Sequence, residues 1–357
     1  MGEPKDVVTW QPPAPGIWRV TMASPPANAL SGPLLDGLHA ALDAAGAAGG
    51  VKVLVVSSAV ERFFAAGADI KHMAAIDATS FNAYGDRMRA VNDRLAAAPF
   101  LSVAAVDGLA LGGGLELAMA ATMRVSGPRA RFGLPEVKLG LIPGAGGTQR
   151  LPRLVGRGRA LDIMLTGRQV PAAEALAIGL VDRLTEGNAA EAALALAGEL
   201  AGASLPAQRA VVAAVDAASD LPLGTGLDFE AERVQALFEH GEAAEGIAAF
   251  TEITLDLMRA LPSGGSVLTA QGIVRHADNV GGFASASIHV AYPRPVPVGA
   301  RARFAAQVVH LGRAFGVVRV TANHDDSGKL MRCLQRRSRR RRLRRAPVIE
   351  PDRRPRL

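Results

Sequence analysis

The chain has 357 residues, of which 49% are apolar and 20% charged, a composition typical of globular rather than disordered proteins. Its single cysteine, Cys333, excludes an internal disulfide and the usual cysteine-based metal site, which favours a reducing cytoplasm. The start lacks a basic region leading into an apolar segment, and no apolar run is long enough to cross a bilayer. We therefore expect neither a signal peptide nor a membrane partner.

The net charge of +7 originates at the C-terminus. Residues 332–357 hold twelve arginines against Glu350 and Asp352, a net charge of +10, so the remainder of the chain carries −3. A dense arginine run can bind phosphates nonspecifically through counterion release. Since it has few apolar residues to bury, we predict a disordered basic tail over 331–357 and no specific nucleic-acid partner.

Short Val-rich runs alternate with longer amphipathic runs in the first part of the chain. The pattern predicts strands at 17–22, 51–58 and 101–106, and helices at 33–45, 80–97 and 114–121. Such alternation indicates an α/β domain with a largely buried sheet. From about residue 157 helices follow one another, predicted at 158–167, 171–179, 189–202, 206–218 and 228–250. Their apolar faces suit either core packing or subunit contact.

Three glycines, Gly112 to Gly114, open an apolar helical stretch (LALGGGLELAMAATM, 109–123) that carries one carboxylate, Glu116. Glycine lets a ligand approach the backbone, and the first amides of a helix have no intrahelical partner. A second run of small residues, FFAAGADIKHM (63–73), also exposes amides before a predicted helix. Two such donors that converge on one carbonyl oxygen form an oxyanion hole.

Glu116 and Glu136 are candidates for acid and base. Two carboxyl groups in one apolar pocket repel each other, so one tends to stay protonated while the other ionises. Spacing alone leaves an alternative open, in which Glu116 pairs with an arginine such as Arg124 and Glu136 is an ordinary surface residue.

Other motifs are not matched. GAGGTQ (144–149) has Gln149 where a dinucleotide fingerprint needs Gly or Ala, and no phosphate-binding P-loop or GxSxG sequence occurs. The histidines lack metal-ligand spacing. We therefore expect no nucleotide cofactor and no metal.

Four ordered segments resemble the crotonase superfamily, and specifically its enoyl-CoA hydratases. They are FAAGADIKHM, AAVDGLALGGGLELAMAA, ARFGLPEVKLGLIPGAGGTQRLPRLVG and LTGRQVPAAEALAIGLVD, and the resemblance extends over about residues 10–251. It implies a spiral of ββα units over 1–190 and a C-terminal helical oligomerisation region over 191–252. A homotrimer or homohexamer is expected.

The resemblance also implies residue roles. The amides of Ala68 and Gly113 would form the oxyanion hole for an acyl-CoA thioester, and Glu116 and Glu136 would be the catalytic pair. Gly144 would place an amide at the start of the next helix, near the reacting water. The further substrate-binding positions would be Ala66, Gly67, Asp69, Ile70, Lys71 and Gly112, with Lys71 directed at a CoA phosphate.

The implied reaction is addition of water to a trans-2-enoyl-CoA, as in fatty-acid β-oxidation, without a cofactor because coenzyme A belongs to the substrate. Glu116 would act as base and Glu136 as acid. The alternatives are a Δ3,Δ2-enoyl-CoA isomerase and a noncatalytic acyl-CoA-binding protein. Related isomerases generally keep only the carboxylate that corresponds to Glu136, so the presence of both favours the hydratase.

Beyond the linker LPSGGS (261–266), strand-like alternation returns. YPRPVPVG (292–299) and VVHLGRAFGVV (308–318) resemble the second half of a hotdog-fold acyl-CoA thioesterase. The helix with His-Gly-Gly and an acidic residue that such enzymes usually carry is not found before it. We therefore expect a partial hotdog-like β segment over 253–330 without thioesterase activity.

Overall fold

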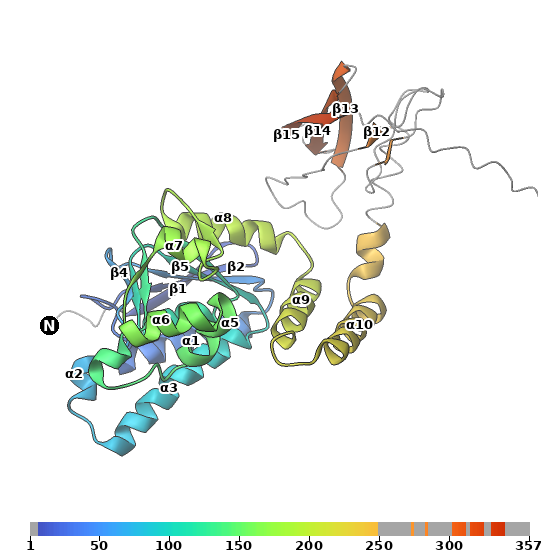
Figure 1. Ribbon diagram of the computed structural model, residues 1–357. Coiled ribbons are helices and arrows are strands. Elements are labelled where there is room, and N and C mark those ends of the chain that lie inside the picture. The colour runs from blue at the N-terminus through green and yellow to red at the C-terminus, as the bar shows by residue number, and fades with distance from the viewer. Residues whose placement is uncertain are drawn as a thin grey trace, which may run out of the picture. The chain divides into compact units, whose positions relative to one another are not determined.

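The structure is a computed structural model that describes residues 6–248 and, beyond them, the backbone of the strands at 273–274, 283–284, 302–311, 315–324 and 330–339. The chain divides into two compact units, Met1–Ala243 and Ala244–Leu357. Figure 1 labels helices and strands of both units. Within the described residues, no helix is both long and apolar enough to span a membrane.

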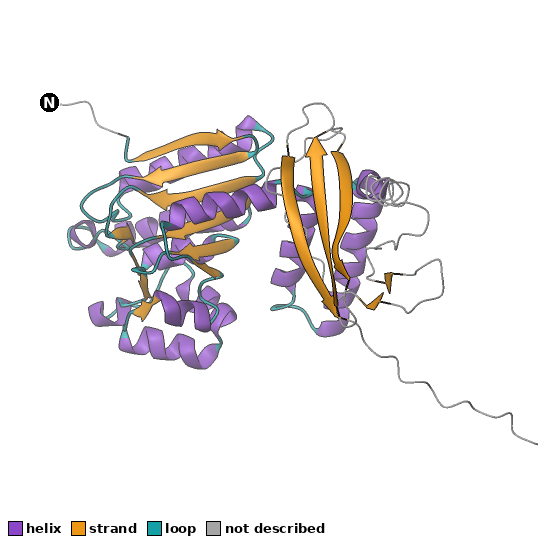
Figure 2. Ribbon diagram, turned by 90° about the horizontal axis from the view of Figure 1, so that it is seen from above, coloured by secondary structure: helices purple, strands orange, loops and turns teal. Residues whose placement is uncertain are grey.

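The larger sheet of the first unit has the strand order β1-β2-β3-β5-β7-β10 (Figure 2). Only β1 and β2 pair antiparallel; every later neighbour in this sheet is parallel. The predicted strands at 17–22 and 101–106 are confirmed, and that at 51–58 begins two residues later. The bounds are β1 Val8–Ala14, β2 Ile17–Met22, β3 Val53–Ser58, β5 Leu101–Val106, β7 Met123–Ser126 and β10 Arg183–Leu184.

Strand β3 shows why its sequence is apolar without a break. Val53 and Val55 pack into the core between this sheet and helix α8 (Ala189–Ala201), whereas Leu54 and Val56 pack into the main core on the opposite face. Successive side chains of a strand point to opposite faces, so a sheet covered on both sides needs apolar residues at every position. Burying each such side chain contributes roughly 1.5–3 kcal/mol.

A smaller sheet has the order β4-β6-β8-β9, with β4 Phe63–Ala65, β6 Leu109–Leu111, β8 Arg131–Gly133 and β9 Val170–Pro171. The chain repeatedly forms one strand of the large sheet, then one of the small sheet, then a helix. This repeat is the predicted spiral of ββα units, which is confirmed. The parallel register aligns Ala65 with Ala110 and Ala110 with Phe132.

The three early helix predictions are confirmed within three residues by α1 (Gly32–Ala48), α3 (Ala78–Ala96) and α4 (Gly113–Ala120). The later predictions correspond to α6 (Arg157–Thr166), α7 (Ala172–Ala177), α8 and α9 (Leu205–Ala217). The short helix α2 (Ile70–Met73), the 3-10 helix η1 (Glu136–Leu139) and α5 (Gly147–Val155) complete the turns of the spiral.

The predicted helix at 228–250 misses an earlier start and an interruption, because the chain is also helical at 243–248. Helix α10 extends from Leu223 to His240, with Pro222 before its first turn. Gly241 ends it in an extended conformation, although its amide still donates a hydrogen bond to the Leu237 carbonyl. The apolar periodicity of the sequence continues across Gly241, whereas α10 ends there because glycine has the lowest helix propensity after proline, and helical residues resume at 243.

In the second unit, β13 (Ala302–Leu311), β14 (Phe315–His324) and β15 (Leu330–Arg339) form an antiparallel sheet, and β11 (Ile273–Val274) pairs with β12 (Phe283–Ala284). Strands therefore occur in the segment predicted to be β-rich. Residues 331–339 were predicted as tail, yet they belong to β15. The rest of the predicted basic tail lies outside the described residues.

Candidate active site

The small sheet brings the two glycine-rich turns together. Ala65 of β4 and Ala110 of β6 are register partners, and Ala68 and Gly113 each follow three residues later in the chain, beyond the ends of these strands. An ideal Cβ built on Gly113 would lie 3.8 Å from the Ala68 nitrogen. The two predicted oxyanion donors are therefore neighbours in the structure.

Both amides are free to bind a ligand. Gly113 is the first residue of α4, where a backbone N–H has no intrahelical acceptor. Within residues 6–248, neither the Gly113 nor the Ala68 amide donates a hydrogen bond to the chain. The α4 dipole adds partial positive charge at Gly113. The pair is suited to hold a carbonyl oxygen that gains negative charge.

Two glycines allow this close approach. Gly112 caps α4 with φ of 53°, and an ideal Cβ there would lie 2.9 Å from Glu136 Oε1. At Gly114 a Cβ would lie only 2.1 Å from the carbonyl oxygen of Ala65. Side chains at either position would push the catalytic turn apart, which explains the glycine run in physical terms.

Glu116 is buried on α4 with 2% of its surface exposed, and its carboxylate is fixed by backbone donors. Its Oε1 accepts hydrogen bonds from the amides of Ala145, at 2.8 Å, and Gly147, at 2.7 Å. Gly147 is the first residue of α5. Burial raises the pKa of Glu116, and the two amides partly oppose this rise because they stabilise the ionised form.

Glu136 has a different environment. It lies at the start of η1, half-buried, with Oε1 close to Gly112. Its Oε2 is buried and accepts no hydrogen bond from the described residues. Burial, with a further contribution from the charge of Glu116, raises the pKa of Glu136 to about 7. The two carboxyl groups are thus close enough to influence each other electrostatically.

The two carboxyl groups differ in their hydrogen-bond partners, and this difference suits them to different roles. Glu116 Oε1 is held by two amides, and its Oε2 accepts no hydrogen bond from residues 6–248. Glu136 has a free buried oxygen that favours the protonated form. Carboxyl groups whose environments push their pKa values apart can serve as base and acid.

The alternative left open by the sequence is wrong. Arg124 binds Asp182, with Nη2 and Oδ2 2.8 Å apart, and donates further hydrogen bonds to the carbonyls of Leu180 and Ala121. It therefore supports the edge of the large sheet and does not pair with Glu116. Glu136 is not an ordinary surface residue, since one of its oxygens is buried.

The predicted substrate-binding positions at 66–71 lie in the turn after β4 and in the first half of α2. Ala66 donates its amide to the Ala27 carbonyl, and the carbonyl of Gly67 accepts from Leu30. Asp69 caps α2, because its side chain accepts hydrogen bonds from the amides of Lys71 and His72.

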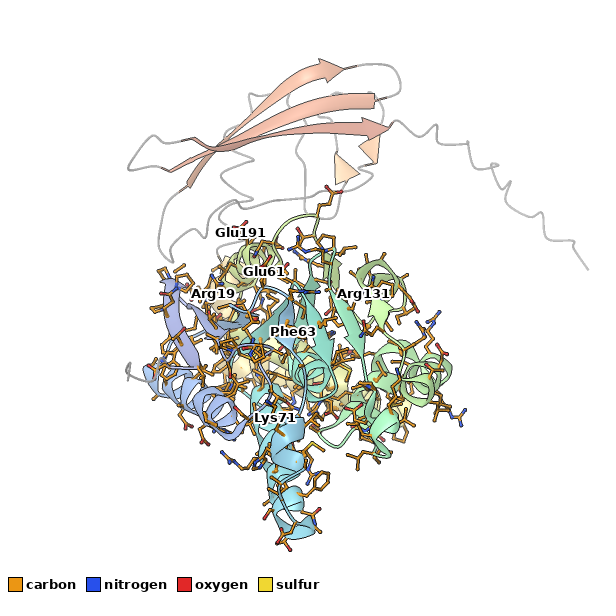
Figure 3. All side chains as sticks on the ribbon, turned by 90° about the vertical axis from the view of Figure 1, so that its left-hand side faces the viewer. Arg19, Glu61, Phe63, Lys71, Arg131 and Glu191 are labelled. Atoms are coloured by element: carbon orange, nitrogen blue, oxygen red, sulfur yellow. The ribbon has the colours of Figure 1, made fainter. Side chains whose placement is uncertain are left out.

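The next two positions face solvent. Ile70 is half exposed, and the ammonium group of Lys71 forms no ion pair or hydrogen bond with the part of the chain that the structure describes. Lys71 belongs to α2, and Figure 3 shows it away from Arg19 and Glu61. An exposed, unpaired cation at this place could meet an anionic group of a ligand.

Gly144 differs from its prediction. It does not begin the next helix, because α5 starts at Gly147, and its carbonyl accepts a hydrogen bond from Arg89. The amides that contact the catalytic carboxylate belong to Ala145 and Gly147. The closely spaced glycines of GAGGTQ (144–149) signal an exposed run of amides, of which the sequence prediction named only that of Gly144.

A hollow of about 380 Å³ lies elsewhere, at the ends of strands β3 and β5. Its lining includes Arg19, Glu61 and Asp107, of which Arg19 and Glu61 are labelled in Figure 3. The Asp107 carboxylate accepts the Ala189 amide and so caps α8. None of the glutamates and amides described above lines this hollow.

Within residues 6–248, no cluster of three or more His, Cys, Asp or Glu could hold a metal ion.

Comparison with known families agrees with this geometry. Residues 14–255 match the family described as Enoyl-CoA hydratase/isomerase, and residues 267–331 match the Thioesterase superfamily. The chain belongs to the enoyl-CoA hydratase/isomerase family. The predicted resemblance to the crotonase superfamily, with a hotdog-like segment after it, is confirmed, as is an enzyme of the enoyl-CoA hydratase class.

Individual relatives support the same assignment. A probable enoyl-CoA hydratase of Rhizobium meliloti is 42% identical over 233 residues, which cover 65% of this chain and 90% of that protein. The mitochondrial methylglutaconyl-CoA hydratase of Mus musculus is 38% identical, over 63% of this chain and 73% of that protein. The crystal structure of an enoyl-CoA hydratase from Bacillus anthracis is 32% identical, with a TM-score of 0.66 over 69% of this chain and 96% of that one.

Proposed function

We propose that this protein hydrates trans-2-enoyl-CoA thioesters to 3-hydroxyacyl-CoA. The proposal depends on one observation. Two free amides and two dissimilar carboxyl groups lie together beyond the carboxyl ends of strands in the small sheet. The amides of Ala68 and Gly113 donate to the thioester oxygen and stabilise the enolate that forms. Each donor of this kind contributes roughly 3–4 kcal/mol to the transition state.

The two glutamates carry the proton transfers. Glu116 Oε2 accepts a proton from a water molecule as its oxygen forms a bond to C3, while Glu136 donates a proton to C2. The C2–C3 double bond becomes a single bond, and the proton gained by Glu116 restores Glu136 through solvent. This assignment follows the environments of the groups: Glu116 is held by donors that favour its ionised form, and Glu136 is raised toward its protonated form. No separate cofactor takes part, since coenzyme A arrives with the substrate.

The test is a hydration assay with crotonyl-CoA, whose ultraviolet absorbance falls when the conjugated double bond is removed. Glu116→Gln and Glu136→Gln should each lower kcat by about 100-fold or more, which is the usual contribution of a positioned acid or base. Glu61→Gln is the matched control, because Glu61 is exposed and lies outside the site. Unchanged turnover in either catalytic variant would contradict the assigned roles.

The substrate class we infer is the straight-chain enoyl-CoA of fatty-acid β-oxidation. Relatives named enoyl-CoA hydratase and methylglutaconyl-CoA hydratase are both similar to this chain. Parallel assays with crotonyl-CoA and 3-methylglutaconyl-CoA separate the two possibilities. A higher kcat/KM for the branched, carboxylated substrate would overturn the straight-chain assignment and leave the hydration chemistry intact.

We also infer that the protein is a homo-oligomer, a trimer or hexamer, assembled through α9 and α10. Neither helix contains a buried residue, and both expose large apolar side chains. Val215 and Phe238 are each 64% exposed, and Val211, Leu227 and Val234 are also exposed. Exposed large apolar side chains clustered on two neighbouring helices are unfavourable in water and typical of subunit contacts. Light scattering during gel filtration should give an oligomer, and Val215→Asp with Phe238→Asp should give the monomer.

The segment assignments remain part of this proposal. We assign 1–190 to the spiral core, 191–252 to the helical oligomerisation region, 253–330 to a hotdog-like segment and 331–357 to a basic tail, whose first residues form β15. The match of 267–331 to the thioesterase superfamily supports the third of these. The single cysteine and the bacterial relatives favour the cytoplasm.

A further inference from the structure

One stripe of helix α3 contacts both halves of the site. Tyr84, Met88 and Asn92 are spaced four residues apart, so they lie on the same face of the helix. Tyr84 is 4% exposed and Asn92 is 2% exposed. Neither takes part in the reaction proposed above. Each uses its buried polar group to hydrogen-bond one backbone segment of the site.

Tyr84 contacts the segment around Ala68. Its hydroxyl accepts a hydrogen bond from the Asp69 amide, at 2.8 Å, and donates one to the Leu30 carbonyl, at 2.7 Å. Leu30 in turn donates its own amide to the Gly67 carbonyl, at 2.8 Å. The residues before and after Ala68 are therefore both tied, directly or through Leu30, to one phenol oxygen. This fixes the peptide plane that carries the Ala68 donor.

Asn92 contacts the turn that holds Glu116. Its Nδ2 donates to the Ala145 carbonyl at 3.0 Å, and that bond is buried. Arg150 donates to the same carbonyl at 3.2 Å. Asn92 on α3 thus holds Ala145 by its carbonyl, and the amide of the same residue donates to Glu116 Oε1.

Met88 lies between these two contacts. Its Sδ would be 3.6 Å from an ideal Cβ on Gly113, so it packs beside the second oxyanion donor. The stripe thus reaches the Ala68 loop, the start of α4 and the turn before α5 from one rigid helix.

We propose that Tyr84 and Asn92 are positioning residues through which α3 sets the Ala68 amide and the Glu116 carboxylate at a fixed separation. Tyr84 holds the oxyanion donor, and Asn92 holds the base. The inference rests on the proposed function, because it assigns these residues to the hydration site. Their buried polar groups serve the geometry of the site rather than the stability of the fold alone.

The charged groups that face Glu116 are Arg150 of α5 and Glu136 of η1. Both side chains are unchanged in the variants tested below. A shift in the titration of Glu116 would therefore report a change in the hydrogen bonds from its amide donors. Ala145 and Gly147 lower the pKa of Glu116 by hydrogen bonding, and loosening their turn should therefore raise it.

The experiment compares Tyr84→Phe and Asn92→Leu, each close in size to the native residue, with Val91→Ala. Val91 is the neighbour of Asn92 on α3, is 2% exposed and packs in the core without a polar contact, so its variant controls for lost packing. Hydration of crotonyl-CoA is measured across pH, and thermal unfolding is followed by circular dichroism. Glu116 is titrated by carboxyl ¹³C NMR, and exchange of the 66–70 amides is followed by mass spectrometry.

We expect kcat to fall about 10- to 100-fold in both variants, as for small misplacements of reacting groups. Asn92→Leu should move the acidic limb of kcat/KM and the Glu116 titration to higher pH. Tyr84→Phe should leave both in place and speed amide exchange at 66–70. Val91→Ala should lower only the unfolding temperature.

The inference is overturned if the two variants match Val91→Ala in activity at equal stability, with unshifted Glu116 titration and unchanged exchange. Failure of the proposed function has a different signature, which is an inactive wild-type protein. In that case the titration and exchange results still decide whether α3 positions the two groups.

Discussion

Glu136→Gln should make the folded protein more stable at alkaline pH while it abolishes hydration. Glu136 has one buried oxygen without a hydrogen-bond donor, so its ionised form is poorly accommodated. Glutamine keeps the shape and the neutral polarity of the protonated acid. The substitution therefore removes a charge that destabilises the folded protein.

The magnitude follows from the pKa, which rises from an ordinary 4.5 to about 7 in the folded protein. One pKa unit corresponds to about 1.4 kcal/mol, so the ionised carboxylate costs the folded state about 3 kcal/mol at alkaline pH. Because part of the side chain faces solvent, we reduce this to about 1–2 kcal/mol. Below 4.5 the group is protonated in both states and contributes no difference; the cost grows as pH rises from 4.5 to about 7 and is constant above that.

Urea unfolding of the wild type and the variant at acidic and alkaline pH measures this difference. We expect nearly equal free energies of unfolding at acidic pH and a more stable Glu136→Gln protein at alkaline pH. Hydration of crotonyl-CoA should be lost at every pH. Equal stabilities at both pH values, or a variant that is less stable at alkaline pH, would refute the view that Glu136 is a strained, proton-holding acid.

Further outcomes follow from the same geometry. The kcat/KM of the wild type should decline as pH rises through about 7, because Glu136 must be protonated to act, and a profile that stays level there would contradict this role. Gly112→Ala should destabilise the protein by about 1–2 kcal/mol and reduce activity, since φ is 53° and a Cβ would meet Glu136 Oε1 at 2.9 Å. Gly46→Ala is its control, because that helical site has open space and alanine should stabilise it. A chain ending at residue 252 should hydrate crotonyl-CoA as fast as the full chain, as the described site contacts lie within 6–248; a large loss of rate would instead give the C-terminal segment a role.

Local sequence determined the elements of the first unit well. Val-rich runs such as 101–106 must be buried on both faces, so their period and length specify central parallel strands. The glycines at 112–114 predicted a helix start able to bind an oxyanion beside the carboxylate of Glu116, and Gly113 does begin α4. The break in the helix after His240 was not predicted, since apolar periodicity says little about where a helix ends.

Tertiary structure decided the chemistry. Whether Glu116 paired with Arg124 or faced Glu136 depended on the register of the small sheet, and register is set by contacts between residues distant in the chain. The donors of Ala145 and Gly147 and the support from Asn92 likewise become visible only once α3 packs against the turn before α5. A pKa depends on burial and on neighbouring charges, both of which arise on folding, so the sequence could name the two acids but the fold assigns their different proton affinities.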